Sequence, residues 1–416
     1  MRKMTLDQWE KKYVAGEIRR FDQKYTMFAR PQWDDKIKEL LRWVTERSPS
    51  KPKAGYTLQD QALRIASRTG TQMHLFEADR PNPSAVARDL AKVLTPERMA
   101  RNIMVSQPPA DEKLEVTDPV KLTHDIKNAA IYFGADMVGI CELDRRWVYS
   151  HSYGLGDGEY NPQEMPKEFQ YAIVMGYHEE YEMLRYFPTY IADAETSLGY
   201  SKMAITNAYI AKFIKMLGHK AMSCSTNDVA VTIPMAMQVG LGDIGRHGML
   251  IAPRYGAGIR LSKVLTSLLL IPDQPIDFGV TEFCATCKVC AERCPSQAIW
   301  HGERTAEPRN ESNAPGGLKW PVDAEKCIGQ WARQGKPCTI CISICPFTKP
   351  DTSFHRLVRW FVDNMRWADS FFVKMDKLLG YEKPRDPADF WDRWEPQPSK
   401  GPRVKIRKRS AVNSEL

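Results

Sequence analysis

Apolar residues recur at two different spacings through the middle of the chain, which predicts helices and strands. In the helical segments they return every three or four residues, and a glycine often follows, as expected at a helix C-terminus. The strand-like segments are short, nearly continuous apolar runs typical of buried strands. Helices are expected at 124–133, 180–187, 201–217 and 234–239, and strands at 137–141, 171–177, 220–224, 245–253 and 256–270. This pattern predicts an α/β (α+β) core over residues 116–282, with a loop insertion at about 144–170.

Two segments without this pattern flank the core. Residues 1–115 are polar, rich in Arg and broken by prolines, with short amphipathic helices such as 34–47. We expect them to wrap the core rather than to form a core of their own. Residues 351–416 contain an aromatic helix at 354–379 and a basic tail. Packing against the body is the first interpretation of these aromatic residues, and a docking face for a membrane partner is the alternative.

Eight of the ten cysteines lie between residues 283 and 350, in two blocks. The blocks read Cys284-x2-Cys287-x2-Cys290-x3-Cys294-Pro295 and Cys327-x10-Cys338-x2-Cys341-x3-Cys345-Pro346. A tight C-x2-C-x2-C loop supplies three thiolates to one four-iron cluster, while the cysteine before proline ligates the other cluster. In the second block an inserted loop, 328–337, displaces the first ligand. The predicted ligand sets are Cys284, Cys287, Cys290 and Cys345 for one [4Fe-4S] cluster, and Cys327, Cys338, Cys341 and Cys294 for the other.

Disulfides and zinc are the alternatives for these cysteines. A chain of 416 residues has ample core and does not need disulfide staples. Paired blocks that each end in Cys-Pro are also not the usual zinc spacing. The two-cluster interpretation is therefore preferred.

Charge and hydropathy add limits on location and partners. The net charge of +8 comes partly from the basic tail, which is interpreted as a solvated end and not as a nucleic-acid site. No run of 18 apolar residues suggests a membrane span, and the N-terminus lacks the apolar region of a signal peptide. A cytoplasmic protein and the mature form of an exported protein both fit these features.

The stretch from Gly242 to Arg260, GDIGRHGMLIAPRYGAGIR, is followed by DFGVTEFC ending at Cys284. In this glycine-rich join, in the cysteine blocks and in the order of elements, residues 117–350 resemble the reductive dehalogenases of organohalide respiration. The resemblance implies a nitroreductase-like, corrinoid-binding core followed by a bacterial ferredoxin-like module at 283–350. It also implies base-off cobalamin, two [4Fe-4S] clusters and wrapping terminal segments.

Three catalytic residues follow from the resemblance. The family's catalytic tyrosine, placed at the start of the long helix, matches Tyr200, its polar partner matches Asn227, and its basic partner matches Arg260. Tyr200 would donate a proton to the carbon that loses the halogen. Arg260, always protonated, would stabilise the charge left on the tyrosine or hold the halide, and Asn227 would orient the tyrosine or the substrate. By residue type alone, these would be a packing residue, a turn residue and an ion-pair residue.

Other site predictions concern the cofactor and the substrate. Thr196, one helical turn before Tyr200, and Trp331, in the loop between cluster ligands, are predicted substrate-pocket walls. His247 is not assigned as a cobalt ligand, since a lone histidine is usually a hydrogen-bonded structural residue. The glycines of the join are the predicted corrinoid contacts: Gly242, Gly245, Gly248, Gly256 and Gly258.

Two other functions compete with dehalogenation. Epoxyqueuosine reductases share a corrinoid core and two clusters, but they have a carboxylate where Tyr200 falls and carry helical repeats, for which the roughly 70 residues after Pro346 are too few. A non-catalytic electron-transfer subunit would not need the long segment before the cysteines. The family inference predicts an organohalide substrate, an external electron donor and a small integral membrane anchor protein, with no nucleic acid and a possible homodimer. It places the protein on the outer face of the cytoplasmic membrane as a mature Tat-exported form, with a cytoplasmic location as the alternative.

Overall fold

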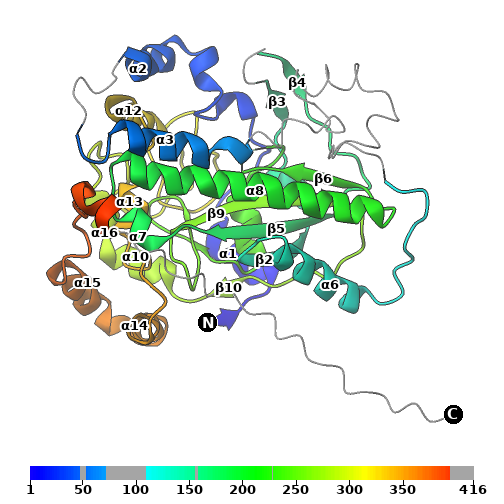
Figure 1. Ribbon diagram of the computed structural model, residues 1–416. Helices are drawn as coiled ribbons and strands as arrows, with labels where there is room; N and C mark the ends of the chain where they lie inside the picture. Colours follow the sequence, from blue (N-terminus) through cyan, green and yellow to red (C-terminus); the bar gives the residue numbers. More distant parts are fainter. Residues whose placement is uncertain (47–52, 72–108, 155–157, 227, 394–416) are drawn as a thin grey trace.

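A four-stranded antiparallel sheet forms the centre of the protein (Figure 1). The computed structural model describes residues 1–46, 53–71, 109–154, 158–226 and 228–393. The strand order is β2-β5-β9-β6, and each neighbouring pair is antiparallel. The strands are β2 (Met137–Glu142), β5 (Tyr171–His178), β6 (Ala221–Cys224) and β9 (Ile259–Thr266). The mixed α/β fold expected from the sequence is confirmed.

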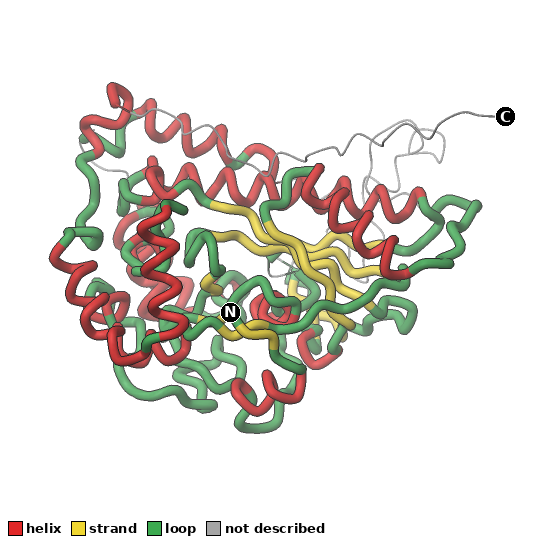
Figure 2. Tube along the Cα trace, turned by 90° about the horizontal axis from the view of Figure 1, so that it is seen from below, coloured by secondary structure: helices red, strands yellow, loops and turns green. Residues whose placement is uncertain are grey.

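Helices cover both faces of this sheet, as Figure 2 shows for the strands gathered between helical segments. The long helix α8 (Tyr190–Met216) and α6 (Pro119–Tyr132) pack on one face, and α9 (Thr232–Gln238) packs on the other. Because successive side chains of a strand point to opposite faces, β5 supplies apolar residues to both cores. Ile173 and Met175 join the α8 side, whereas Ala172 and Val174 join the α9 side. Burial on both faces explains why β5 reads as one continuous apolar run.

Several elements differ from the sequence-based expectation. Helix α8 begins at Tyr190, not at residue 201, because the Thr189 hydroxyl accepts a hydrogen bond from the Ile191 N–H and caps the helix there. Tyr200 therefore lies inside the helix and not at its start, which corrects the expected position. Trp331 lies on helix α12 (Ala324–Gln334), so its expected placement in a loop is also wrong. The helix expected at 180–187 is only α7 (Tyr181–Leu184).

Two further segments are broken by turns. The strand expected at 245–253 is a hairpin of β7 (Asp243–Ile244) and β8 (Leu250–Ile251), because Gly248 turns the chain with a φ of +75°. The helix expected at 354–379 is two helices, α14 (Ser353–Asn364) and α15 (Asp369–Leu378). The expected insertion contains a short hairpin of β3 (His151–Tyr153) and β4 (Tyr160–Pro162).

The cysteine blocks lie on short helices and their connecting turns. Cys284 and Cys287 belong to α10 (Val280–Cys287), and Cys290 belongs to α11 (Val289–Glu292). Cys327 belongs to α12, and Cys341 to α13 (Ile340–Ser343). Cys141 is buried in β2 as expected for a core cysteine.

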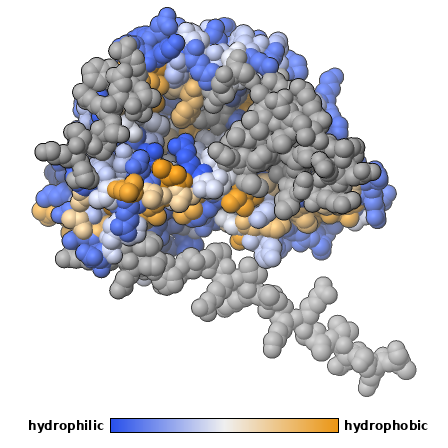
Figure 3. All heavy atoms as spheres, turned by 45° about the horizontal axis from the view of Figure 1, so that its top comes forward, coloured by the Kyte–Doolittle hydropathy of each residue, from blue (hydrophilic) through white to orange (hydrophobic). Residues whose placement is uncertain are grey.

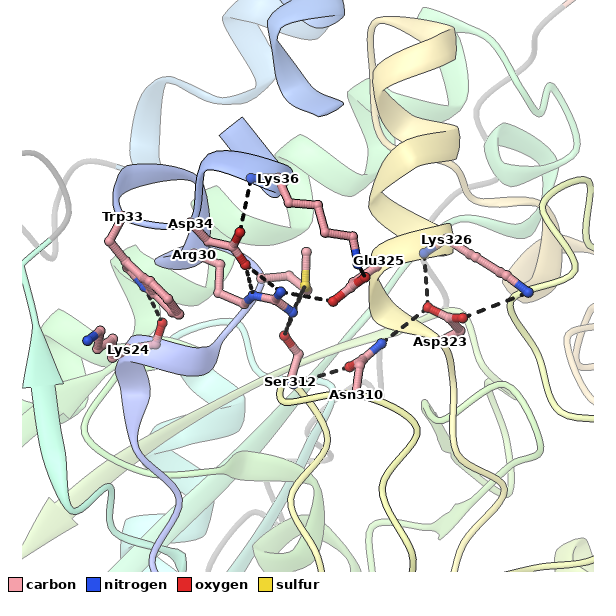
Figure 4. Close-up of polar contacts among 11 residues, drawn as sticks. Lys24, Arg30, Trp33, Asp34, Lys36, Asn310, Ser312, Asp323, Glu325 and Lys326 are labelled. Carbon is pink, nitrogen blue, oxygen red and sulfur yellow. Dashed lines mark hydrogen bonds and ion pairs between the residues drawn. The ribbon is translucent and has the colours of Figure 1, made fainter. Parts of the chain in front are cut away.

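The N-terminal segment packs across the core and the cysteine region. Its strand β1 (Arg2–Lys3) pairs with β10 (Ile276–Asp277), and its helices are α1 (Leu6–Tyr13), α2 (Asp35–Glu46) and α3 (Leu58–Ser67). Arg30 contacts Glu325 at 2.8 Å and donates to the Ser312 hydroxyl at 3.2 Å, as Figure 4 shows. A buried arginine thus connects the segment before α2 to the start of α12.

The C-terminal helices α14, α15 and α16 (Phe390–Arg393) leave many aromatic side chains exposed. Val362 and Val373 pack inward, but Trp367 is 83% exposed and Phe371 is 61% exposed. Packing against the body therefore accounts for only part of this segment. In the part of the chain that the structure describes, no helix combines the length and apolar character needed to cross a membrane.

Candidate active site and cysteine centres

Arg260 reaches the candidate site because of its place in the sheet. It lies on the inner strand β9 opposite Tyr177 of β5, on the face that α8 covers. Gly199 of α8 allows this approach, since a Cβ atom there would lie 2.8 Å from Arg260 Cγ. The absence of a side chain at Gly199 lets the arginine pass under the helix.

A buried polar group surrounds Arg260. Its Nε donates to Glu179 Oε1 at 3.0 Å, and its Nη2 donates to Thr196 Oγ1 at 3.3 Å. The Thr196 hydroxyl in turn donates to Glu179 Oε1 at 3.0 Å. Glu179 Oε2 is buried and has no hydrogen-bond partner among the described residues. The carboxylate thus fixes the arginine and keeps one oxygen uncommitted.

Tyr200 stands beside this group. The Arg260 guanidinium carbon lies 5.3 Å from the centroid of the Tyr200 ring, within the range of a cation–π contact. The structure therefore brings together Tyr200, Arg260 and Thr196, three of the residues singled out in the sequence. Asn227 lies outside the described residues.

Charges around the site reinforce the cationic form of Arg260. Burial is the largest single effect and lowers the pKa of Arg260, but Glu179, Tyr200 and Asp193 together outweigh it, so the net pKa is raised. For two nearby carboxyl groups on α8, burial is the effect that decides the direction of the pKa shift. Burial raises the pKa of Asp193, and it raises the pKa of Glu195 to about 7 although Glu195 accepts a hydrogen bond from the Glu180 N–H. Arg260 therefore stays charged, whereas the Glu195 carboxyl group changes between its neutral and charged forms near pH 7.

Two further residues lie on helix α12 or just after it, near the cysteines. Trp331 packs 6.4 Å from the Phe28 ring, and its indole N–H is buried without a partner in the described chain. Its role as a pocket wall stays a prediction. Lys336 is buried, and burial lowers its pKa to about 8, with Asp193 and Cys338 acting in the opposite direction. Lys336 was not predicted as a site residue, although a lysine two residues before a cluster cysteine was visible in the sequence.

Glu179 is the main residue that the sequence interpretation missed. It follows the last residue of β5, and its backbone N–H donates to the Gly258 carbonyl at 2.9 Å. A pair of glutamates directly after an apolar strand run was the available signal. Only the antiparallel register of β5 and β9 shows that the first of them meets Arg260.

Several cysteines of each predicted set lie beside one another, and their role as cluster ligands stays a prediction. All ten cysteines of the chain are free, so the disulfide alternative is wrong. Burial and then the neighbouring Cys345 and Cys287 raise the pKa of Cys284. Burial followed by Cys338, Cys327 and Cys294 raises the pKa of Cys341. The electrostatic neighbours of each thiol are thus mainly the members of its own predicted set.

The first group surrounds a cavity with about 280 Å³ of empty space, part of it open to solvent. Cys284, Cys287, Cys290 and Cys345 all contribute to its lining. Among the described residues, no three His, Cys, Asp or Glu side chains converge as they would on one metal ion. Thiols placed around a cavity suit a multi-atom cluster better than a single ion.

The glycines of the join are held in place mostly by contacts within the protein. A Cβ on Gly242 would lie 2.2 Å from the Ile251 carbonyl oxygen, and a Cβ on Gly256 would lie 2.3 Å from the Phe347 carbonyl oxygen. Gly245 lies against the His247 ring, Gly248 against Val322, and Gly258 against Leu184. These contacts explain the glycines by chain packing, and their contact with a corrinoid stays a prediction.

Arg246 joins the glycine-rich segment to the first cysteine block. It is almost fully buried over the Trp320 ring, and its Nε donates to the Cys284 carbonyl at 2.9 Å. Its Nη1 donates to the carbonyls of Trp300 at 2.8 Å and Gly302 at 3.0 Å. One side chain therefore fixes the position of the cysteine loop relative to β7.

Fold and site define a class of protein: a mixed α/β core with a half-buried tyrosine beside a buried Arg–Glu pair, joined to a segment with eight cysteines in two blocks. Sequence comparison with curated proteins identifies the family. The chain is 38% identical over 303 residues to the tetrachloroethene reductive dehalogenase of Sulfurospirillum multivorans, which covers 67% of this chain and 60% of that protein. It is 36% identical over 301 residues to a protein of the same name from Desulfitobacterium hafniense, covering 63% and 54%. The predicted resemblance is confirmed: the chain is a homologue of the reductive dehalogenases.

Solved structures agree with this kinship. A catabolic reductive dehalogenase superposes with a TM-score of 0.69 at 24% identity, covering 92% of this chain and 49% of the other, which supports the fold. A second reductive dehalogenase, described with a mechanism for B12-dependent dehalogenation, gives a TM-score of 0.58 at 26% identity, covering 66% and 39%. This chain spans about 60% of the length of the Sulfurospirillum multivorans protein. No family model matches the chain.

Similarity to the competing family is narrower. The epoxyqueuosine reductase of Lactococcus garvieae is 29% identical over 131 residues, which covers 30% of this chain and 34% of that protein. The match to dehalogenases extends over more than twice that share of the chain.

Proposed function

We propose that this protein is a reductive dehalogenase that removes a halogen from an organohalide, with a corrinoid and two [4Fe-4S] clusters as cofactors. The observation that carries the proposal is the contact of Tyr200 with the buried Arg260, in a homologue of enzymes named for this reaction. When bound, the corrinoid would supply the reducing cobalt chemistry at the carbon–halogen bond, and the clusters would supply single electrons. The rest of the catalytic work falls to side chains of this chain.

Tyr200 is the proposed proton donor. Loss of the halogen leaves a carbon that needs a proton, and a positioned side-chain hydroxyl can deliver it. The fixed Arg260 cation would stabilise the negative charge that stays on the tyrosine, and in a buried site this stabilisation is stronger than in water. Glu179 and Thr196 act as positioning residues, because their hydrogen bonds hold the guanidinium in place. Asn227 keeps its proposed role in orienting the tyrosine or the substrate.

The cysteine groups fit two clusters. Cys284, Cys287, Cys290 and Cys345 would hold one cluster around the cavity that they line, and Cys294, Cys327, Cys338 and Cys341 would hold the other. These placements support a ferredoxin-like module at 283–350 beside a corrinoid-binding, nitroreductase-like core, which is part of the proposal. Figure 3 shows that one face of the molecule is hollowed, with hydrophobic residues inside the depression, a setting suited to a large cofactor.

The exposed aromatic residues of α14 and α15 support one further element of the proposal. Trp360, Trp367 and Phe371 lie on a surface that the described chain does not cover. We assign this surface to a small integral membrane anchor, consistent with a peripheral protein at the outer face of the membrane.

A Tyr200→Phe variant tests the proposal. Anaerobically reconstituted protein, supplied with a reduced dye, should release halide from at least one compound in a panel of chlorinated and brominated alkenes, alkanes and phenols. The variant should lose about a hundredfold or more of this rate, because general acid catalysis contributes roughly 10²–10⁴-fold. Iron and corrinoid contents should stay at the wild-type level.

Tyr209→Phe is the matched control, since Tyr209 lies on the same helix but is exposed. It should keep the wild-type rate. A Tyr200→Phe variant with full activity would remove Tyr200 from the mechanism. Wild-type protein that binds no corrinoid would point instead to an electron-transfer subunit, and turnover of epoxyqueuosine would point to the competing family.

A further inference from the structure

We infer that His247 donates a hydrogen bond from Nε2 to a sulfur of the cluster held by Cys284, Cys287, Cys290 and Cys345, and that this bond raises the reduction potential of that cluster. The inference rests on the proposed function only in requiring that the cluster is present. It assigns a task to a histidine that the Tyr200 mechanism does not use.

The position of His247 carries the first step. It lies in the turn between β7 and β8, is 5% exposed, and lines the same cavity as the four cysteines. Gly245 makes room for the ring, because a Cβ there would lie 2.9 Å from His247 Cε1. The imidazole is therefore confined at the wall of the cluster cavity.

The ring's hydrogen bonding carries the second step. The backbone N–H of Met249 donates to His247 Nδ1 at 3.1 Å, so Nδ1 is the unprotonated nitrogen. The proton of the neutral ring must then be on Nε2. This N–H is buried and has no partner among the described residues. A buried donor left without an acceptor is destabilising, so an acceptor is expected close by.

The cavity offers few side-chain acceptors to this N–H group. Apart from the cysteines and His247, its lining residues are Arg246, Lys288, Phe283, Phe347 and Pro346. None of these side chains carries a carboxylate, amide or hydroxyl group that accepts hydrogen bonds. No backbone carbonyl accepts from Nε2 either, since this atom has no partner among the described residues, so a sulfur of the bound cluster is the acceptor expected in this cavity. Hydrogen bonds to cluster sulfurs tune reduction potentials, and they favour the reduced, more negative state.

Two substitutions of His247 distinguish the acceptor role of Nδ1 from the donor role of Nε2. His247→Asn places an amide oxygen near Nδ1, where it still accepts from Met249, but removes the donor at Nε2. His247→Gln places an amide N–H near Nε2 and keeps the donor. The holoprotein of each variant is titrated potentiometrically, and the EPR signals of the reduced clusters are recorded.

In His247→Asn, the reduced-to-oxidised ratio of one cluster at a fixed solution potential should fall about tenfold, which is about 59 mV for a one-electron couple. His247→Gln should stay near the wild-type value, and the second cluster should be unchanged in both variants. Unchanged potentials in His247→Asn would overturn the inference. Equal shifts in both variants would also overturn it, because they would show a structural effect of the ring.

A measurement on the wild-type protein avoids any folding defect of the variants. Protein labelled with ¹⁵N-histidine should show a histidine nitrogen coupled to one reduced cluster in pulsed EPR, and the absence of this coupling would refute the hydrogen bond. The iron content of the wild-type protein distinguishes a failure of the proposed function from a failure of the inference about His247. Wild-type protein that binds no iron would refute the proposed function, whereas bound clusters without the histidine coupling would refute only the role of His247.

Discussion

The polar group at Arg260 and the cysteine groups are both buried, but they differ in charge. Arg260 and Glu179 form a complete ion pair inside the core, with Thr196 hydrogen-bonded to both. Without a cluster, burial raises the pKa values of Cys284, Cys287 and Cys290, which favours their neutral thiol forms. Removing one partner of the first arrangement leaves a buried charge, whereas removing one thiol leaves only a small space. The fold should therefore depend much more on the Arg260 group, and the cofactor content on the cysteines.

The largest expected effect on stability comes from Arg260→Met. The Glu179 carboxylate, which is almost fully buried, would lose its cation, and breaking a buried pair in this way costs about 3–5 kcal/mol. Thermal denaturation of the anaerobically purified variant should show the loss. The double variant Arg260→Met with Glu179→Gln should recover much of it, since no charge is then left unpaired. A single variant as stable as wild type would show that the pair does not hold the core.

A smaller effect should come from Glu195, a buried carboxyl group on α8. Burial raises its pKa to about 7, above the ordinary value of 4.5. Between these values the folded protein holds the proton and the unfolded chain does not. Stability from this group is therefore present below pH 4.5, falls as the pH rises to 7, and stays low above pH 7. A shift of this size corresponds to about 3 kcal/mol.

Glu195→Gln removes this dependence and keeps an oxygen for the Glu180 N–H. The stability of the variant relative to wild type should rise between pH 4.5 and 7 and then level off, as measured by thermal denaturation at several pH values. Glu115→Gln, at an exposed glutamate, is the control and should give a flat difference. A flat difference for Glu195→Gln as well would contradict the raised pKa.

The smallest effect on the fold is expected for Cys287→Ala in metal-free protein. A buried free thiol behaves as a small apolar side chain, so its loss should cost about 1 kcal/mol. Bound iron after reconstitution should nevertheless fall by about half, because one of two clusters loses a ligand. Cys141→Ala, in strand β2, should lower stability similarly and leave iron unchanged. Equal iron in both variants would remove Cys287 from the cluster.

The cysteine groups and the Arg260 group also differ in how well the sequence predicts them. The cysteine sets could be predicted because the cysteine before each Cys-Pro proline ligates the other cluster in such motifs, and Cys284, Cys287, Cys290 and Cys345 line one cavity. The strands β2, β5 and β6 also lie close to their expected positions, since buried strands read as apolar runs. Glu179 could not be assigned, because its partner Arg260 lies 81 residues further along the chain. That contact depends on the register between β5 and β9, which no short segment encodes.

Arg246 has a consequence for how this chain can be engineered. A cassette cut out at residue 280 would leave behind the guanidinium that the carbonyls of Cys284, Trp300 and Gly302 use as their donor. The core in turn would keep a buried cation without its acceptors, at a substantial cost. These contacts tie the cysteine blocks to the core, and we expect that the blocks cannot be exchanged alone. Chimeras between dehalogenases should therefore exchange the segment from β7 through the second cysteine block as one unit.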